Sequence, residues 1–112
     1  MADAPACIFC KIAGHSIPVQ AIHEDERSIA FADQNPQAPT HLLLIPKEHF
    51  ANVTEPDAEL LGHLLHTAGA LGRKLLPGGH RVVINTGPDG GQTVEHLHLH
   101  ILGGRHMGWP PG

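Results

Sequence analysis

The chain has 112 residues, of which 41% are hydrophobic, and its formal net charge at pH 7 is −4 with the histidines neutral. This length suits a modest core, so we expect a single domain over 1–112 with residues 105–112 as a C-terminal tail. There is no basic run and no apolar stretch approaching the roughly 20 residues of a membrane helix, so neither a nucleic-acid polymer nor a membrane is an expected partner. The first residues lack the basic and apolar regions of a signal peptide, which predicts a cytoplasmic location.

The first half of the chain predicts strands. Residues 21–33 are typical of a hairpin, with the polar segment 25–27 as its turn. Two prolines within residues 34–40 predict a loop, and the apolar run 41–45 predicts a central strand covered on both faces.

One long helix is predicted over residues 55–76. Thr54 is the expected N-cap, with Asp57 three residues on, and the segment 77–79 ends the helix. Leucine and alanine recur at spacings of three and four and predict one apolar stripe: Leu61, Leu64, Leu65, Ala68, Leu71 and Leu75.

Residues 80–86 predict another strand, a glycine-rich loop follows over 87–91, and a histidine-containing strand comes next. Strands and helices do not alternate along the chain. The order therefore predicts an α+β fold with an antiparallel sheet.

Three histidines stand at alternating positions: His96, His98 and His100. The two-residue period of a strand would place all three on one face and turn the intervening residues Leu97, Leu99 and Ile101 toward the core. Alternate strand residues lie about 6.6 Å apart, so two imidazoles can chelate one ion, but a tetrahedral site cannot easily take the third. Neutral imidazole is also a nucleophile, and adjacent imidazoles resist being charged together. With donors from the upstream segment 90–93, the pattern favours nucleophilic attack on phosphorus; the alternative is an exposed polar face.

The chain has two cysteines, Cys7 and Cys10, in a Cys-x-x-Cys pair. In a cytoplasmic chain this pair indicates half of a metal site or a redox motif. Too few residues precede Cys7 for the strand that a redox motif would need. Two buried structural thiols are the remaining alternative.

The segment 96–102 resembles the histidine triad signature, in which three histidines alternate with apolar residues. Segments 8–12, 30–33, 36–41, 45–47 and 90–94 and the tail from Gly103 are similar to the Hint branch of that superfamily. The resemblance implies a HIT-like fold: a sheet of about five strands, one long helix and a short N-terminal helix, in a homodimer whose sheets join. It also implies hydrolysis of purine nucleoside 5′-phosphoramidates, adenosine or guanosine, to a nucleoside monophosphate and an amine, with no cofactor required.

By this resemblance His98 is the nucleophile that forms a covalent nucleotidyl-histidine. The backbone carbonyl of His96 orients the His98 ring, His100 donates to a phosphate oxygen, and His41 joins the relay. Asp33 accepts from the ribose hydroxyls, for which the alternative is a local Asx turn. The resemblance assigns apolar residues to the base, namely Ile8, Phe31 and Leu43. Four further residues would position the phosphate and the leaving group: Asn85, Gly91, Gln92 and Thr93.

Related bacterial proteins suggest a structural zinc on Cys7, Cys10, His49 and His96. Two thiolates and two imidazoles would make a closed tetrahedral site. Two residues depart from the Hint pattern: Thr93 replaces a common Ser and Gln34 a common Ile. Three other functions stay open: a zinc hydrolase with a catalytic metal on His96 and His98, a nucleotide-binding regulatory module with little turnover, and a dinucleoside polyphosphate hydrolase. The tail favours Hint over the last, and the resemblance places it near the partner's site.

Overall fold

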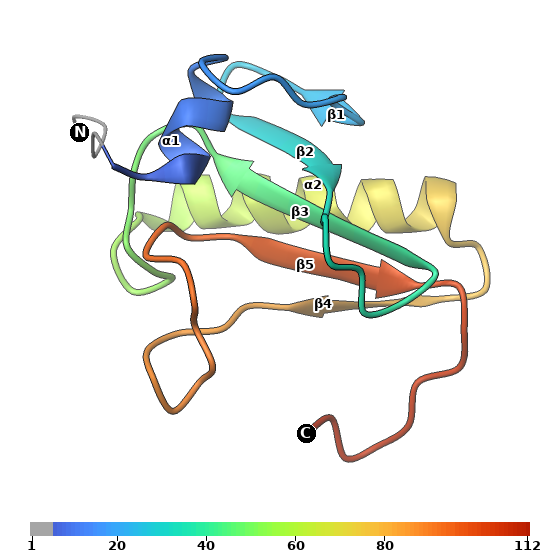
Figure 1. Ribbon diagram of the computed structural model, residues 1–112. Helices are drawn as coiled ribbons and strands as arrows, with labels where there is room; N and C mark the ends of the chain where they lie inside the picture. Colours follow the sequence, from blue (N-terminus) through green and yellow to red (C-terminus); the bar gives the residue numbers. More distant parts are fainter. Residues whose placement is uncertain (1–5) are drawn as a thin grey trace.

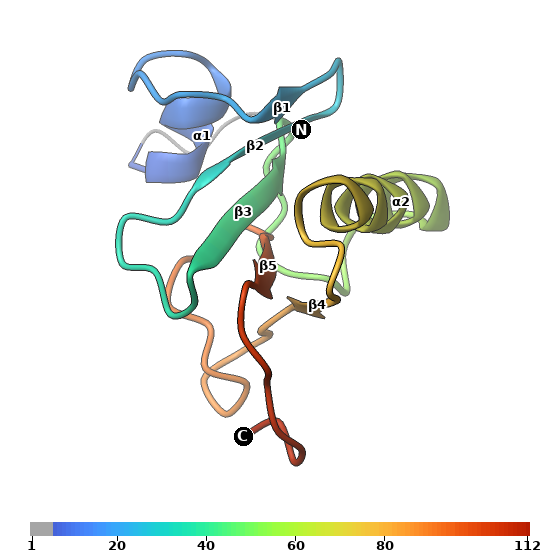
Figure 2. The same cartoon turned by 90° about the vertical axis from the view of Figure 1, so that its right-hand side faces the viewer.

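The computed structural model describes residues 6–112 and contains two helices and one five-stranded antiparallel sheet. In chain order the elements are α1 (Ile8–Ala13), β1 (His23–Glu24), β2 (Ser28–Ala32), β3 (Thr40–Pro46), α2 (Ala58–Leu75), β4 (His80–Val83) and β5 (Leu99–Gly103). The sheet order is β1-β2-β3-β5-β4 (Figure 1). Figure 2 shows α1 and α2 on opposite sides of this sheet. The predicted α+β class, the five strands, the long helix and the short N-terminal helix are thus confirmed.

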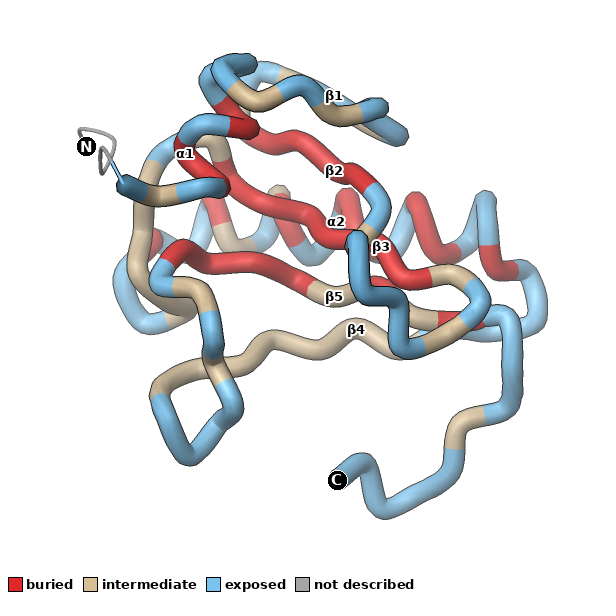
Figure 3. Tube along the Cα trace, in the orientation of Figure 1, coloured by how far each residue is buried: buried red, intermediate tan, exposed pale blue. Residues whose placement is uncertain are grey.

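Strand β3 lies in the middle of the sheet, and both of its faces are covered. Leu42 and Leu44 belong to the core cluster under α2, whereas Leu43 and Ile45 belong to the cluster under α1. The alternation follows from the two-residue period of a strand. It explains why residues 41–45 form a continuous apolar run in the sequence, and Figure 3 shows the buried residues concentrated in β2, β3, the start of β5 and the inner side of α2.

The long helix starts later than predicted. It spans Ala58–Leu75, and its N-cap is Asp57, whose Oδ1 accepts from the backbone N–H of Leu60 at 2.9 Å. The prediction of Thr54 as the cap was wrong, because the Thr54 hydroxyl donates to Asn52 within the preceding turn. Pro56 also disfavours helical conformation at the residue before it.

The predicted apolar stripe of this helix is partly wrong. Leu64, Ala68 and Leu71 are buried as expected, but Leu65 and Leu75 are 56% and 41% exposed. Leu60, outside the predicted stripe, is buried instead. Neither helix among residues 6–112 combines the length and the apolar character that a membrane span needs.

The strands around the histidines are shorter than predicted. β4 ends at Val83 rather than at residue 86, and β5 begins only at Leu99. Of the three histidines only His100 therefore lies within a strand, and the prediction of one continuous histidine strand was wrong. The intervening residues do face the core as expected, because Leu97, Leu99 and Ile101 are buried in the cluster under α2.

Candidate functional site

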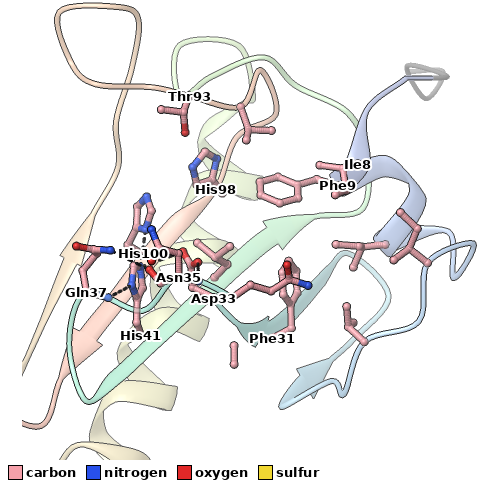
Figure 4. Close-up of a pocket in the computed structure, with 17 residues that line it drawn as sticks. Ile8, Phe9, Phe31, Asp33, Asn35, Gln37, His41, Thr93, His98 and His100 are labelled. Carbon is pink, nitrogen blue, oxygen red and sulfur yellow. Dashed lines mark hydrogen bonds and ion pairs between the residues drawn. The ribbon is translucent and has the colours of Figure 1, made fainter.

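A pocket of about 440 Å³ opens on the α1 side of the sheet. Apolar side chains of α1, β2 and β3 line one part of it, and histidines of β3 and β5 line the other (Figure 4). Eight residues that the sequence analysis assigned a catalytic or binding role line this pocket: Ile8, Phe31, Asp33, His41, Leu43, Thr93, His98 and His100. The pocket thus combines an apolar end with a polar end.

The His98 ring is held in one tautomer. Its Nδ1 lies 2.7 Å from the backbone carbonyl oxygen of His96, so Nδ1–H is the donor of this hydrogen bond. His98 is buried, yet its ring lines the pocket. Its other nitrogen, Nε2, therefore keeps a lone pair. A neutral imidazole in this state can attack an electrophile in the pocket.

A second chain of hydrogen bonds fixes the tautomers of His41 and His100. The backbone N–H of Gln37 donates to His41 Nδ1 at 3.0 Å, which leaves the proton of a neutral ring on Nε2. This Nε2–H faces His100 Nδ1 at 2.8 Å. His100 accepts there and keeps its own proton on Nε2, as a donor available to a ligand.

The electrostatics of the site keep His100 neutral. Burial, and then the neighbouring His98 and His41, lower the pKa of His100 to about 4, while Asp33 opposes this shift. At neutral pH the ring therefore donates one N–H without adding a positive charge to the site.

The Asp33 carboxylate has two partners, the backbone of Asn35 and the ring of His41. Its Oδ1 accepts from the backbone N–H of Asn35 at 2.8 Å, which is the local turn considered from the sequence. Its Oδ2 lies 3.4 Å from His41 Nε2. The carboxylate lines the pocket as well, so the turn and a role toward a ligand hydroxyl are compatible.

A second group of residues lies behind the pocket wall. The ligand atoms of Cys7, Cys10, His49 and His96 all lie within 4.8 Å of one another. Cys10 Sγ lies 3.1 Å from His49 Nδ1 and 3.5 Å from His96 Nδ1, and these two nitrogens are 3.1 Å apart. With Zn–S of about 2.3 Å and Zn–N of about 2.0–2.1 Å, the edges of a tetrahedral site measure about 3.3–3.8 Å. The four residues therefore fit a structural zinc site.

The environment of His96 suits a metal ligand. His96 is fully buried, and its Nε2 lies 3.0 Å from the backbone carbonyl oxygen of Pro46, to which Nε2–H donates. This bond leaves the Nδ1 lone pair directed at the cysteine sulfurs, as in the backbone-carbonyl contacts that orient metal-bound imidazoles. His96 does not line the pocket, and its burial excludes for this residue the alternative of an exposed polar face.

The zinc-hydrolase alternative needs one metal on both His96 and His98. Among residues 6–112, the metal-compatible group around His96 does not include His98. The Nδ1 of His98 is engaged by the His96 carbonyl instead. The arrangement therefore separates the metal-compatible group from the candidate nucleophile.

Three residues expected near the phosphate do not line the pocket: Asn85, Gly91 and Gln92. The Asn85 amide donates to the Gly90 carbonyl, and the Gln92 amide donates to the carbonyls of Ala51 and Val94. They hold the glycine-rich loop in shape. Thr93, next in the chain, does reach the pocket, where Figure 4 draws it beside His98 and far from Phe31.

Sequence reasoning missed several contributors to the site, of which Gln37 and Phe9 contact the histidines. Gln37 acts through its backbone N–H, which no side-chain pattern reveals. Phe9 lines the pocket and packs against the rings of His96 and His98. The sequence did offer one signal for Phe9, which is its position between Cys7 and Cys10. A large apolar side chain between two metal-binding residues needs a buried surface to pack against.

The sequence of this chain is similar to proteins of one known family. The HIT domain model matches residues 15–107 of the chain. The chain belongs to the HIT family. This HIT protein is 54% identical over 109 residues to an uncharacterized HIT-like protein of Synechococcus elongatus, covering 94% of this chain and 96% of the relative. It is 49% identical over 116 residues to the 14 kDa zinc-binding protein of Zea mays, covering 98% of this chain and 90% of the relative.

Solved structures agree with the fold of this HIT protein. The crystal structure of a HIT family hydrolase from Legionella pneumophila Philadelphia 1 superposes with a TM-score of 0.89 at 49% identity, covering 95% of this chain and 99% of the other. A histidine triad nucleotide-binding protein from Candida albicans gives a TM-score of 0.81 at 31% identity, covering 94% and 83%. The protein is thus hydrolase-like at the level of its family.

Proposed function

We propose that this HIT protein is a purine nucleoside phosphoramidase that works through a covalent nucleotidyl-histidine on His98. The observation that carries the proposal is the 2.7 Å contact between His98 Nδ1 and the His96 carbonyl, which leaves Nε2 as the nucleophile in the pocket. Support comes also from the relatives named as HIT family hydrolase and histidine triad nucleotide-binding protein.

The chemistry proceeds in two displacements at phosphorus. His98 Nε2 attacks the α-phosphorus, the P–N bond breaks, and the leaving nitrogen takes up a proton from solvent and departs as the amine. The oxygen of a water molecule then bonds to phosphorus, the His98–phosphorus bond breaks, and the proton that the water loses returns to solvent as the nucleoside 5′-monophosphate is released. Splitting one displacement into two is the advantage of a covalent intermediate. The neutral His100 donates its Nε2–H to a phosphate oxygen, and the Thr93 hydroxyl lies on the leaving-group side.

The remainder of the pocket accommodates the nucleoside. Ile8, Phe31 and Leu43 provide an apolar end for the purine, and Asp33 provides an acceptor for the ribose hydroxyls. The loop that contains Asn85, Gly91 and Gln92 acts indirectly. Its internal hydrogen bonds hold Thr93 next to the phosphate.

Zinc belongs to this proposal as a structural ion on Cys7, Cys10, His49 and His96. When bound, it ties the N-terminal segment to the sheet and takes no part in the chemistry. The donor distances and the zinc-binding relative from Zea mays support this assignment. The proposal also includes a homodimer in which the tail approaches the partner's pocket. Trp109 of that tail is 83% exposed in the single chain, and the Arg81 guanidinium donates to the Gly108 carbonyl.

The test is a substrate panel run on zinc-loaded protein and again with metal removed. It compares adenosine and guanosine phosphoramidates with dinucleoside polyphosphates and free AMP. Fast cleavage of the P–N bond, with a nucleotidyl mass on the peptide that contains His98, supports the proposal. Preferred cleavage of the polyphosphates would assign a dinucleoside polyphosphate hydrolase, and tight AMP binding without any transfer would assign a regulatory module.

A further inference from the structure

The metal-compatible group and the pocket share one short helix. α1 has six residues, and its N-cap is Cys7, whose Sγ accepts from the backbone N–H of Cys10. Between and after the two cysteines, Ile8, Phe9 and Ile12 line the apolar end of the pocket. A helix this short is not stable by itself, so its place depends on what holds its ends and its buried face.

Phe9 contacts both His98, which lines the pocket, and His96, which belongs to the metal-compatible group. Its ring centroid lies 5.2 Å from that of His98 at 74° and 5.8 Å from that of His96 at 85°. Both are edge-to-face arrangements, which aromatic pairs prefer. The Nδ1 hydrogen bond fixes one atom of the His98 ring. The rings of Phe9 and His100 pack against it at centroid distances of 5.2 and 5.0 Å and hold its orientation.

His96 connects the same two places through its own atoms. Its ring contributes Nδ1 to the group with the cysteines, and its backbone carbonyl accepts from His98. The residue is fully buried and its Nε2–H is engaged by Pro46. His96 therefore joins the metal-compatible group, through its ring, to the acceptor that selects the His98 tautomer, through its backbone.

Resting on the function proposed above, we infer that the Cys7–Cys10–His49–His96 group and the base end of the pocket form one unit, in which Phe9 is a positioning residue. Filling of the metal-compatible group fixes α1. α1 fixes the apolar wall and, through Phe9, the orientation of the His98 ring. Metal content should therefore determine nucleotide affinity, although no metal atom contacts the nucleotide.

The first experiment compares Phe9→Leu with the matched variant Phe50→Leu. Phe50 packs against the other core cluster, under α2, and does not line the pocket. Both variants should bind zinc at the wild-type stoichiometry by elemental analysis. AMP affinity, measured by calorimetry, should fall about three- to tenfold in Phe9→Leu and stay near wild type in Phe50→Leu, because the first variant alone loses the aromatic contacts of the pocket wall.

A spectroscopic readout separates positioning from general destabilisation. In protein labelled with ¹⁵N-histidine, the ring-nitrogen shifts of His98 should indicate a single Nδ1–H tautomer in wild type and in Phe50→Leu. In Phe9→Leu they should move toward a mixture of tautomers. Wild-type affinity together with an unchanged His98 spectrum in Phe9→Leu would overturn the inference.

A second experiment uses wild-type protein with and without zinc, and it decides the matter if Phe9→Leu does not fold. Removal of zinc should weaken AMP binding and should speed amide exchange in α1 more than in α2. Unchanged affinity and unchanged exchange in verified metal-free protein would refute the inference. If wild type binds AMP but cleaves no phosphoramidate, the proposed reaction is wrong, and AMP affinity still tests the coupling between the metal-compatible group and the pocket. If wild type does not bind AMP, the His98 spectrum with and without zinc tests that coupling.

Discussion

Replacing both cysteines, Cys7→Ser with Cys10→Ser, should destabilise the fold. The structure gives the scale of the effect. Cys10 is 3% exposed and His96 is fully buried, and the His96 Nδ1 faces the two sulfurs and His49. An unsatisfied buried polar group costs about 1–3 kcal/mol. Loss of the metal adds a fraction of the roughly 10–16 kcal/mol measured for structural zinc in small peptides.

We therefore expect a loss of at least about 3 kcal/mol, which in a domain of this size lowers the melting temperature by at least about 10 °C. Differential scanning calorimetry of zinc-loaded protein measures this directly, with elemental analysis of each sample. The control is His66→Gln on the exposed side of α2, which should change neither zinc content nor melting temperature. Wild-type protein that purifies without zinc, or a double variant that melts within about 2 °C of wild type, would refute the reasoning.

Three further predictions concern the pocket and the tail. His98→Ala should lower turnover at least about a thousandfold while AMP still binds, since the nucleophile is lost and the nucleoside contacts remain; near-normal turnover would contradict the mechanism. Because the pKa of His100 is lowered to about 4, the unfolded chain binds more protons than the fold below the ordinary histidine pKa, and stability should fall as pH drops from about 6.5 toward 4. Urea unfolding should show a weaker pH dependence in His100→Asn across that window, and an equal dependence would count against it. Deleting residues 105–112 should change the ranking of amine leaving groups more than the rate on the best substrate, as measured by a phosphoramidate panel; an unchanged ranking, with a monomer in sedimentation, would argue against a role for the tail.

The parts of the fold that local chemistry determines were predictable. The hairpin turn at 25–27 formed as expected, because the Asp25 carboxylate accepts from the backbone N–H groups of Arg27 and Ser28. The apolar run 41–45 correctly indicated a strand with two covered faces. The helix start was not predictable from the capping pattern alone, since Thr54 and Asp57 are both good caps and the turn around Asn52 decides between them.

The candidate site shows the same division. The alternation of histidines pointed to His98 and His100, and the cysteine spacing pointed to a metal-compatible group. The resemblance supplied His49 and His96 as further members of that group, whereas the Pro46 carbonyl that orients the His96 ring was missed, because it is a backbone group far away in the sequence. Contacts made through the backbone, such as that from Gln37 to His41, leave no trace in residue type.

The register between β3 and β5 determines both the contact between His41 and His100, which we call the relay, and the packing of the core under α2. His41 pairs with Leu102 and Leu43 with His100, so the two histidines are diagonal neighbours on the pocket face, within reach of one another. On the other face the same pairing matches Leu42 with Ile101 and Leu44 with Leu99 under α2. A slip of one residue between these strands would turn His41 toward α2 and bring leucines to the pocket. A misregistered chain would therefore lose its core and its relay in the same step, so that any molecule stable enough to persist already has its histidines aligned.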